Sequence, residues 1–173
     1  MPAYVALLRA VNVGGTGKLP MTALQAMCRA EGFAAVRTWI ASGNVVFAAE
    51  RSEAEVRAAL ERRLQAHAGK PVGVLVRTAA EMAGVLAANP FPDAPPSRTV
   101  AIFLSEPPPP DALAQVRGRV DEEIRLGVRE IYVAYRAGMA RSKLRIPAAA
   151  AGTARNLATV AKLAVMAAAI AQR

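Results

Sequence analysis

In the first half of the chain, segments with the hydrophobic pattern of strands alternate with segments that have the hydrophobic period of helices. Apolar runs predict strands over 4–8, 36–40, 45–48 and 72–77, the middle two joined by a hairpin in which Gly43 and Asn44 take positive φ. Helical spacing predicts helices over 20–31, 53–68 and from Thr78 to about residue 88. The order β-α-β-β-α-β, with one further helix, is that of the split βαβ motif. We therefore expect an α+β protein with a ferredoxin-like module over residues 1–90.

The second half has a weaker pattern that follows a proline-rich connection over residues 91–98. Strands are predicted over 100–105 and 130–135, and a helix begins at an N-cap Asp111 and runs to about Val120. Residues 141–151 are expected to be irregular or a short helix. A final helix is predicted over 156–171, with Val160, Leu163, Ala167 and Ile170 on one face. We expect a second α+β module over 99–173, related to the first or irregular.

The composition narrows the class of protein. The chain has 173 residues, of which 54% are hydrophobic, so it has enough apolar surface to form a core. The single Cys28 excludes a disulfide framework and every zinc or iron–sulfur site that needs several cysteines. No apolar run is long enough to span a bilayer, and the first residues lack the pattern of a signal peptide. A cytoplasmic protein that does not enter a membrane is expected.

The net charge of +9 is unevenly distributed along the chain. No acidic residue follows Glu130, whereas seven basic residues do, which gives the last 43 residues a charge of +7. Such a segment attracts phosphates, acidic partners or anionic surfaces. The alternative is that the many arginines and alanines reflect a GC-rich genome.

Three polar clusters are candidates for ligand binding. The glycine-rich loop over 12–18 lies between a strand and a helix, where backbone N–H groups can hold an anion. It is not a phosphate-binding loop of the Walker A type, because Asn12 stands where a glycine is required and Leu19 replaces the Ser or Thr. A tight turn that needs glycine torsions is the alternative.

The second cluster covers residues 138–144, where Arg and Lys side chains beside Ser142 suit a phosphate, and a solvated basic loop is the alternative. The third covers residues 152–156 at the expected start of the last helix, with Thr153 as its cap. With residues of the first module, the candidate ligand-binding residues are Arg9, Asn12, Gly14, Gly15, Lys18, Ser42, Asn44, Arg141, Ser142, Lys143, Thr153, Arg155 and Asn156.

Other chemistries have little support. No carboxylate falls inside the three clusters, so neither a pair of catalytic acids nor a metal site is predicted. The single His67 suits the negative end of its helix, and Cys28 suits a core position. No cofactor and no metal are expected.

Several of these segments resemble one bacterial family, known as domain of unknown function 1697. The resemblance rests on these segments: Leu8-Arg9-Ala10-Val11-Asn12-Val13-Gly14-Gly15, Lys18, Met21, Gly32-Phe33, Thr38, Ser42-Gly43-Asn44-Val45-Val46-Phe47, Asn89-Pro90-Phe91, Ser142-Lys143-Leu144, Thr153-Ala154-Arg155-Asn156, Thr159-Val160 and Lys162-Leu163. It covers essentially the whole chain and implies an α+β fold with no established activity. The family usually has Gly where this chain has Ala10, and an aromatic residue, commonly Trp, where it has Leu157. If that Trp contacts a ligand, this chain binds the ligand more weakly or binds another; if it only packs, Leu157 is tolerated.

The sequence thus favours a protein that binds a phosphate-bearing ligand, a nucleotide or a nucleic acid, through a cationic surface without acids. One alternative is a small transferase or hydrolase acting on a phosphorylated metabolite, with Lys143, His67 or an unplaced carboxylate as its base. The other is an interaction module that forms a homodimer through its last helix. The sequence does not decide whether the protein is an enzyme.

Overall fold

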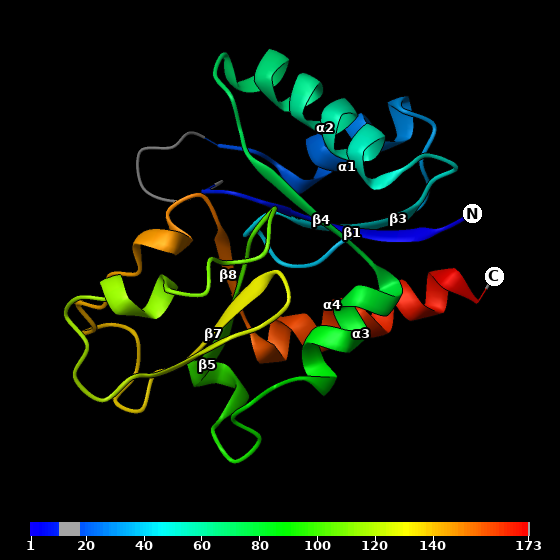
Figure 1. Cartoon of the computed structure of the whole chain (residues 1–173). Helices are drawn as coiled ribbons and strands as arrows, with labels where there is room; N and C mark the ends of the chain where they lie inside the picture. Colours follow the sequence, from blue (N-terminus) through cyan, green and yellow to red (C-terminus); the bar gives the residue numbers. More distant parts are fainter. Residues whose placement is uncertain (11–17, 173) are drawn as a thin grey trace. The chain divides into compact units, whose positions relative to one another are not determined.

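The chain forms two compact units, one made of Met1–Ala83 and Lys162–Arg173 and the other of Gly84–Ala161. A computed structural model describes residues 1–10 and 18–172. In the first unit, four strands form an antiparallel sheet in the order β2-β3-β1-β4 (Figure 1). They are β1 (Ala3–Leu8), β2 (Ala34–Thr38), β3 (Asn44–Ala48) and β4 (Val74–Thr78).

The helices of the first half begin where the sequence predicts. They are α1 (Met21–Ala30), α2 (Glu53–Ala68) and α3 (Ala79–Ala87). The Ser52 hydroxyl accepts the N–H of Glu55, whose carboxylate accepts the N–H of Ser52, and this reciprocal pair starts α2. Thr78 and Glu81 form the same pair at the start of α3. These local hydrogen bonds satisfy N–H groups that the helices themselves cannot.

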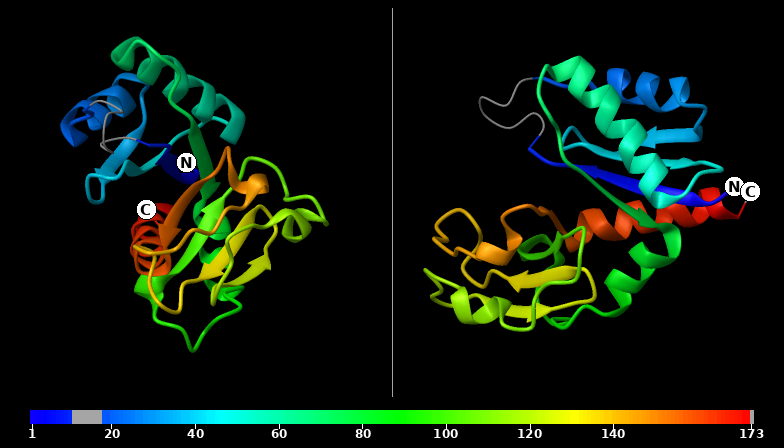
Figure 2. Two further views of the ribbon diagram at one scale, coloured as in Figure 1. Left: turned by 90° about the vertical axis from the view of Figure 1, so that its left-hand side faces the viewer. Right: turned by 45° about the horizontal axis from the view of Figure 1, so that its top comes forward.

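One core lies between the first sheet and the helices α1 and α2, which both lie on the same side of the sheet (Figure 2). Leu24 and Cys28 of α1 and Leu60 of α2 are fully buried in it. The Phe33 and Phe47 rings stack there with their centroids 4.5 Å apart. The helices are therefore fixed by burial of their apolar faces, as their spacing predicts.

The hairpin between β2 and β3 differs from the prediction in its backbone. Positive φ occurs at Gly43 (87°) as expected, but also at Ile40 (53°) and not at Asn44. Asn44 is instead the first residue of β3 and is fully buried. Its side-chain amide donates to the carbonyl of Trp39 and to the hydroxyl of Ser42. Those two hydrogen bonds close the turn, so Asn44 does not need a left-handed conformation.

The second unit has its own antiparallel sheet, in the order β6-β7-β5-β8. The strands are β5 (Thr99–Phe103), β6 (Glu123–Leu126), β7 (Glu130–Ala134) and β8 (Thr153–Asn156). A short 3₁₀ segment, η1 (Pro96–Arg98), precedes β5. Two more, η2 (Ala112–Gln115) and η3 (Pro147–Ala149), lie between β5 and β6 and between β7 and β8, and α4 (Leu157–Ala171) follows β8. The predicted face of α4, with Val160 and Leu163, is buried.

Two predictions for this unit are wrong. The helix expected from Asp111 to Val120 is only the four-residue η2. The Asp111 side chain forms no capping hydrogen bond, and the chain extends at Val116 and reaches a φ of 70° at Gly118. The strand β6, which is short and begins at the third of three consecutive acidic residues, was not predicted at all.

The fold is therefore α+β, with two four-stranded antiparallel sheets and four helices in the described residues. None of the helices within residues 1–10 and 18–172 is long and apolar enough to cross a membrane.

Candidate anion-binding site

A cavity of about 450 Å³ lies in the first unit beside the end of β1. Four of its described lining residues carry nitrogen donors: Arg9, Lys18, His67 and Lys70. None of the described lining residues is acidic. Leu19, Leu64, Pro71 and Val72 supply apolar walls. A hollow with convergent donors and no described acid has the chemistry of an anion site.

The sheet register brings two distant segments to this cavity. The N–H of Arg9, directly after β1, donates to the carbonyl of Gly73, directly before β4, at 2.9 Å. A Cβ atom on Gly73 would lie 3.0 Å from Cδ of Arg9, so glycine leaves room for the arginine stem. Because β1 and β4 are antiparallel neighbours, the residue leaving one strand lies beside the residue entering the other.

The end of α2 places the other two donors. His67 lies in the last turn of α2, and Gly69 ends the helix with a φ of 73°. The chain then turns back toward β4 through Lys70. The carbonyls at this helix end carry partial negative charge, which the side chains of His67 and Lys70 are placed to offset.

Ala10, on the cavity wall, has a left-handed backbone with a φ of 51°. Only glycine adopts this conformation without steric cost. This explains physically why the family that the chain resembles usually has Gly at this position.

Three predicted residues, Asn12, Gly14 and Gly15, lie outside the described residues. Arg9 and Lys18 line the cavity, as do Lys70 and His67, neither of which was a candidate for ligand binding, although His67 was named as a candidate base. A signal for Lys70 was available, because the predicted strands over 4–8 and 72–77 bring their adjoining loops together when they pair antiparallel.

Ser42 and Asn44 do not line this cavity. Their hairpin is joined to β1 by a 2.9 Å hydrogen bond from the N–H of Leu8 to the carbonyl of Gly43. The side chains of Ser42 and Asn44 bond to each other within the turn. The structure thus gives both residues a role in shaping the hairpin.

Arg141, Ser142 and Lys143 line a separate hollow of about 530 Å³ in the second unit. The expectation that no carboxylate lies among the clusters is wrong here, because the Ser142 hydroxyl donates to buried Glu122 at 2.5 Å. That hydrogen bond, and a second from the Val120 N–H, hold the pKa of Glu122 below its usual range. Glu122 is separated from Ser142 by 20 residues in sequence, so no local pattern could indicate their contact.

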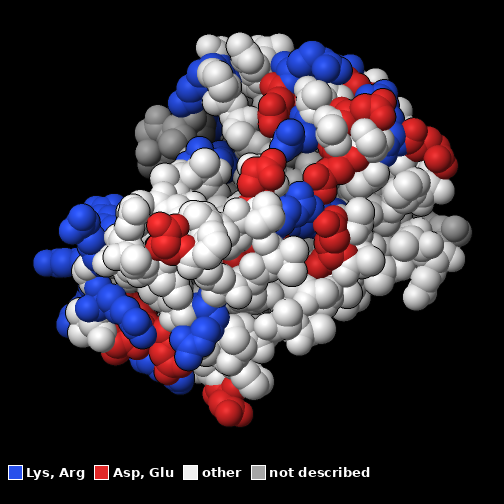
Figure 3. All heavy atoms as spheres, in the orientation of Figure 1, with Lys and Arg blue, Asp and Glu red and all other residues white. Residues whose placement is uncertain are grey.

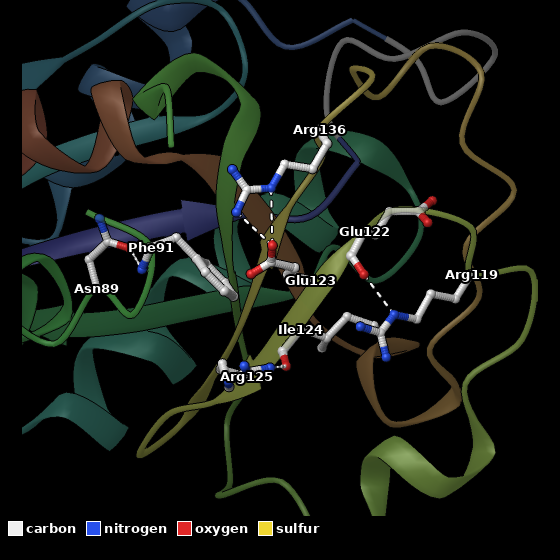
Figure 4. A network of polar contacts seen from close by, with 8 residues as sticks. All are labelled: Asn89, Phe91, Arg119, Glu122, Glu123, Ile124, Arg125 and Arg136. Atoms are coloured by element: carbon white, nitrogen blue, oxygen red, sulfur yellow. Dashed lines mark hydrogen bonds and ion pairs between the residues drawn. The ribbon is translucent and has the colours of Figure 1, made fainter. Parts of the chain in front are cut away.

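Further contacts involve the backbone of Glu122 and the side chain of its neighbour Glu123 (Figure 4). Nε of Arg119 donates to the backbone carbonyl of Glu122 at 2.6 Å, and Arg136 forms an ion pair with Glu123. Glu122 thereby ties the loop after η2 to the loop that contains Ser142. The hydrogen bonds of Glu122 therefore hold the two loops together, which is a structural role.

The third cluster, Thr153 to Asn156, is the strand β8 and not the first turn of a helix. The cap of α4 is Asn156, whose side-chain oxygen accepts the N–H of Thr159 at 2.8 Å, so the expectation that Thr153 caps the helix is wrong. Arg155 is 8% exposed and donates to the Thr153 hydroxyl and the Ala154 carbonyl. Burial lowers the pKa of Arg155 to about 10. Leu157 is also buried, which supports a packing role at this position.

Within residues 1–10 and 18–172, no group of three or more His, Cys, Asp and Glu side chains is placed to hold a metal ion. The fold and the site together define an α+β protein with two antiparallel sheets and a cationic cavity in its first unit.

The chain belongs to the family described as "Protein of unknown function (DUF1697)", which it matches over residues 1–132. The resemblance seen in the sequence is thereby confirmed. In structure it is similar to the conserved bacterial protein SP0830 from Streptococcus pneumoniae, with a TM-score of 0.78 and 22% sequence identity. The similarity covers 96% of this chain and 98% of that one, and it shows a shared fold. Comparison with curated proteins found no match.

Proposed function

We propose that the cavity beside β1 binds the phosphate group of a small ligand, either a nucleotide or another phosphorylated metabolite. The observation that carries the proposal is the convergence of Arg9, Lys18, His67 and Lys70 on one cavity with no acid among its described lining residues. An arginine supplies a planar fork of donors and a lysine a mobile point charge, and both suit phosphate oxygens.

The size and walls of the cavity favour a small molecule over a nucleic-acid strand as its occupant. Its volume of about 450 Å³ lies within the range of ligand pockets. Leu19, Leu64 and Val72 would contact the part of the ligand that carries no charge. None of the described lining residues is a Phe, Tyr or Trp, so recognition of a base by stacking on such a ring is not part of the proposal.

The ferredoxin-like arrangement of the first unit is part of the same proposal. Its element order and its strand order β2-β3-β1-β4 support it. In this arrangement the cavity lies where two loops adjoin the central strand β1 and its neighbour β4 at the edge of the sheet. A cytoplasmic location, where phosphorylated metabolites are abundant, stays a prediction.

Calorimetric titration with ATP and with pyrophosphate tests the proposal. We expect Lys18→Ala and Lys70→Ala each to raise Kd by about tenfold or more, because a hydrogen bond to a charged group contributes about 1.5–3 kcal/mol. Arg62→Ala is the matched control, since this exposed residue of α2 carries the same charge and does not line the cavity. The proposal fails if neither ligand binds at millimolar concentration, or if the control weakens binding as much as the two lysine variants do.

A small transferase or hydrolase is the second candidate, and the position of His67 in the cavity favours it. An imidazole beside a bound phosphate can transfer a proton during reaction. Release of inorganic phosphate from phosphorylated substrates, measured for the wild type and for His67→Gln, distinguishes an enzyme from a binding protein. Loss of turnover in His67→Gln, with ligand binding retained, would show that the protein is an enzyme and that His67 takes part in its reaction.

A further inference from the structure

Five basic side chains gather on two paired segments of the second unit, residues 117–119 and 141–145. We call these segments the basic ribbon. The N–H of Arg117 donates to the carbonyl of Arg145 at 2.9 Å, and the N–H of Arg145 returns a bond to Arg117 at 2.8 Å. Gly118 lies so close to the Lys143 carbonyl that a Cβ atom would be only 2.2 Å from it. The two segments are thus held together by the backbone.

The ribbon has one apolar side and one cationic side. Leu144 and Ile146 pack against the core of the second unit. Exposure alternates along this segment, so residues 141, 143 and 145 are exposed, whereas 142, 144 and 146 are half-buried. The exposed members of the ribbon are Arg117, Arg119, Arg141, Lys143 and Arg145. Lys and Arg side chains gather at the left of Figure 3, over the loops of this unit.

The ribbon juxtaposes like charges that the chain does not neutralise. Arg117 and Arg145 lie directly opposite each other across the backbone bridge, and like charges in that position destabilise a strand pair. Neither they nor Arg141 and Lys143 form an ion pair with any described residue. A polyanion bound across the ribbon would attract both arginines and so offset the repulsion between them.

The nearby carboxylates do not cancel the charge. Glu122 accepts hydrogen bonds from the Ser142 hydroxyl and the Val120 N–H, and Glu123 is paired with Arg136. Glu122, which these hydrogen bonds hold in its ionised form, and Asp121 therefore place two negative charges beside five basic side chains, which leaves a net charge of +3.

We propose that the basic ribbon binds the phosphate backbone of a nucleic-acid duplex. Alternate residues of an extended segment lie about 6.7 Å apart, so the cations form a row that can contact several phosphates. The ribbon contains no aromatic residue, and stacking on aromatic rings is how proteins hold single strands. A two-stranded ribbon is also an element that the major groove admits. The ribbon and the cavity beside β1 share no residue, because the cavity is built from residues of the other unit.

Fluorescence anisotropy with a labelled duplex of about 20 base pairs, over about 50–200 mM salt, tests this surface. The log–log salt slope measures the phosphates contacted, at about 0.9 per contact. The test variant is Arg117→Ala/Arg145→Ala. The matched control is Arg29→Ala/Arg62→Ala, which removes two exposed charges from α1 and α2 of the first unit. Thermal melting of each variant reports whether it folds.

We expect wild type and control to bind with the same slope, and the ribbon variant to lose about two units of slope and at least about fivefold in affinity at low salt. Three results would overturn the proposal: no duplex binding at about 50 mM salt, an equal loss in the control, or an unchanged slope in the ribbon variant. Displacement of the duplex by poly-glutamate as readily as by unlabelled duplex would also overturn it, because the surface would then recognise negative charge alone.

Discussion

Ala10 holds a left-handed backbone, with a φ of 51°, that costs free energy for any residue with a Cβ atom. We expect Ala10→Gly to raise the free energy of unfolding by about 0.5–1 kcal/mol, less than the full steric cost because glycine loses more entropy on folding. Ala58→Gly, in the exposed middle of α2, makes the same chemical change in a helix and should lower stability by about 1 kcal/mol. Urea denaturation measures both, and destabilisation by Ala10→Gly would refute the assigned torsion.

The thiol of Cys28 is fully buried in the core between α1 and the first sheet. Burial raises its pKa to about 12, so almost no thiolate is present at pH 8. We expect no reaction of the native protein with a thiol reagent at pH 8, and one reactive thiol per chain after unfolding in guanidinium. Rapid reaction of the native protein would show that Cys28 is accessible and would reopen a chemical role for it.

At the scale of elements, Glu31 joins α1 to α2. Its carboxylate, at the end of α1, accepts hydrogen bonds from Arg51 at 2.9 Å and from Arg63 at 2.5 Å. The hydrogen bonds from Arg51 and Arg63 hold the pKa of Glu31 below its usual range. A carboxyl with a lower pKa in the folded state stabilises the fold above its unfolded pKa, and the contribution is lost as the pH falls through the folded pKa.

We therefore expect Glu31→Gln to lower the free energy of unfolding at pH 7 by about 1 kcal/mol, a modest value because both arginines are more than one third exposed. The difference from wild type should shrink as the pH falls from about 5 to about 3. Glu61→Gln, whose carboxylate lies 3.9 Å from Arg57 on the surface of α2, is the control and should change little. A difference that is constant with pH would contradict the assigned ion pair.

Helices and strands with a strong local sequence signal could be predicted, whereas those with a weak local signal could not. Ser52 and Glu55 predict the start of α2 because both partners of its capping box lie within one turn of the chain. In contrast, β6 and β8 have only four residues each and form because β7 and β5 supply their ladders. Pairing of that kind depends on segments distant in sequence, which local patterns do not record.

The homodimer through α4 stays a prediction. The face on which the sequence places its apolar residues, including Val160 and Leu163, is buried within the chain. A seam between two copies would need the opposite face, where Val165 is 66% exposed among small residues. Light scattering over a range of protein concentrations decides whether this face pairs.

At the scale of the whole molecule, the two sheets share one strand order and one register. When Tyr4 is aligned with Val100, their ladder partners Thr78 and Asn156 coincide. Thr78 and Asn156 each cap the helix that follows, α3 and α4. The halves thus repeat one topology, although no sequence repeat indicates it.

The shared topology does not produce two equal sites. The hydrogen bond from Leu8 to Gly43 has its counterpart from Leu104 to Arg129, at the same length of 2.9 Å. However, a Cβ atom on Gly152 would lie 2.7 Å from a backbone oxygen and 2.8 Å from Leu104, so the space beside β5 is closely packed. Beside β1, in contrast, the cavity is open, and the stem of Arg9 lies against Gly73 on its wall.

Part of the candidate site could be predicted in the same way as the elements. Lys18 was found because it follows a glycine-rich loop, a local signal. Arg155 was proposed from its charge, but its burial and its bonds to neighbouring oxygens give it a structural role. Lys70 and His67 reach the cavity only through the pairing of β1 with β4 and the end of α2. The predicted strands over 4–8 and 72–77 already indicated the place of Lys70 if they pair antiparallel, whereas the place of His67 depends on where α2 ends in the tertiary fold.

The most direct test of the anion site uses the single histidine of the chain. Because there is one imidazole, its signals in a two-dimensional NMR spectrum belong to His67 without further assignment. Pyrophosphate is added at constant pH and ionic strength, and the indole signal of the single Trp39, which does not line the cavity, serves as the internal control. If the cavity binds an anion, we expect a saturable shift of the His67 signals with the Trp39 signal unchanged. An unchanged His67 signal up to millimolar pyrophosphate would contradict it.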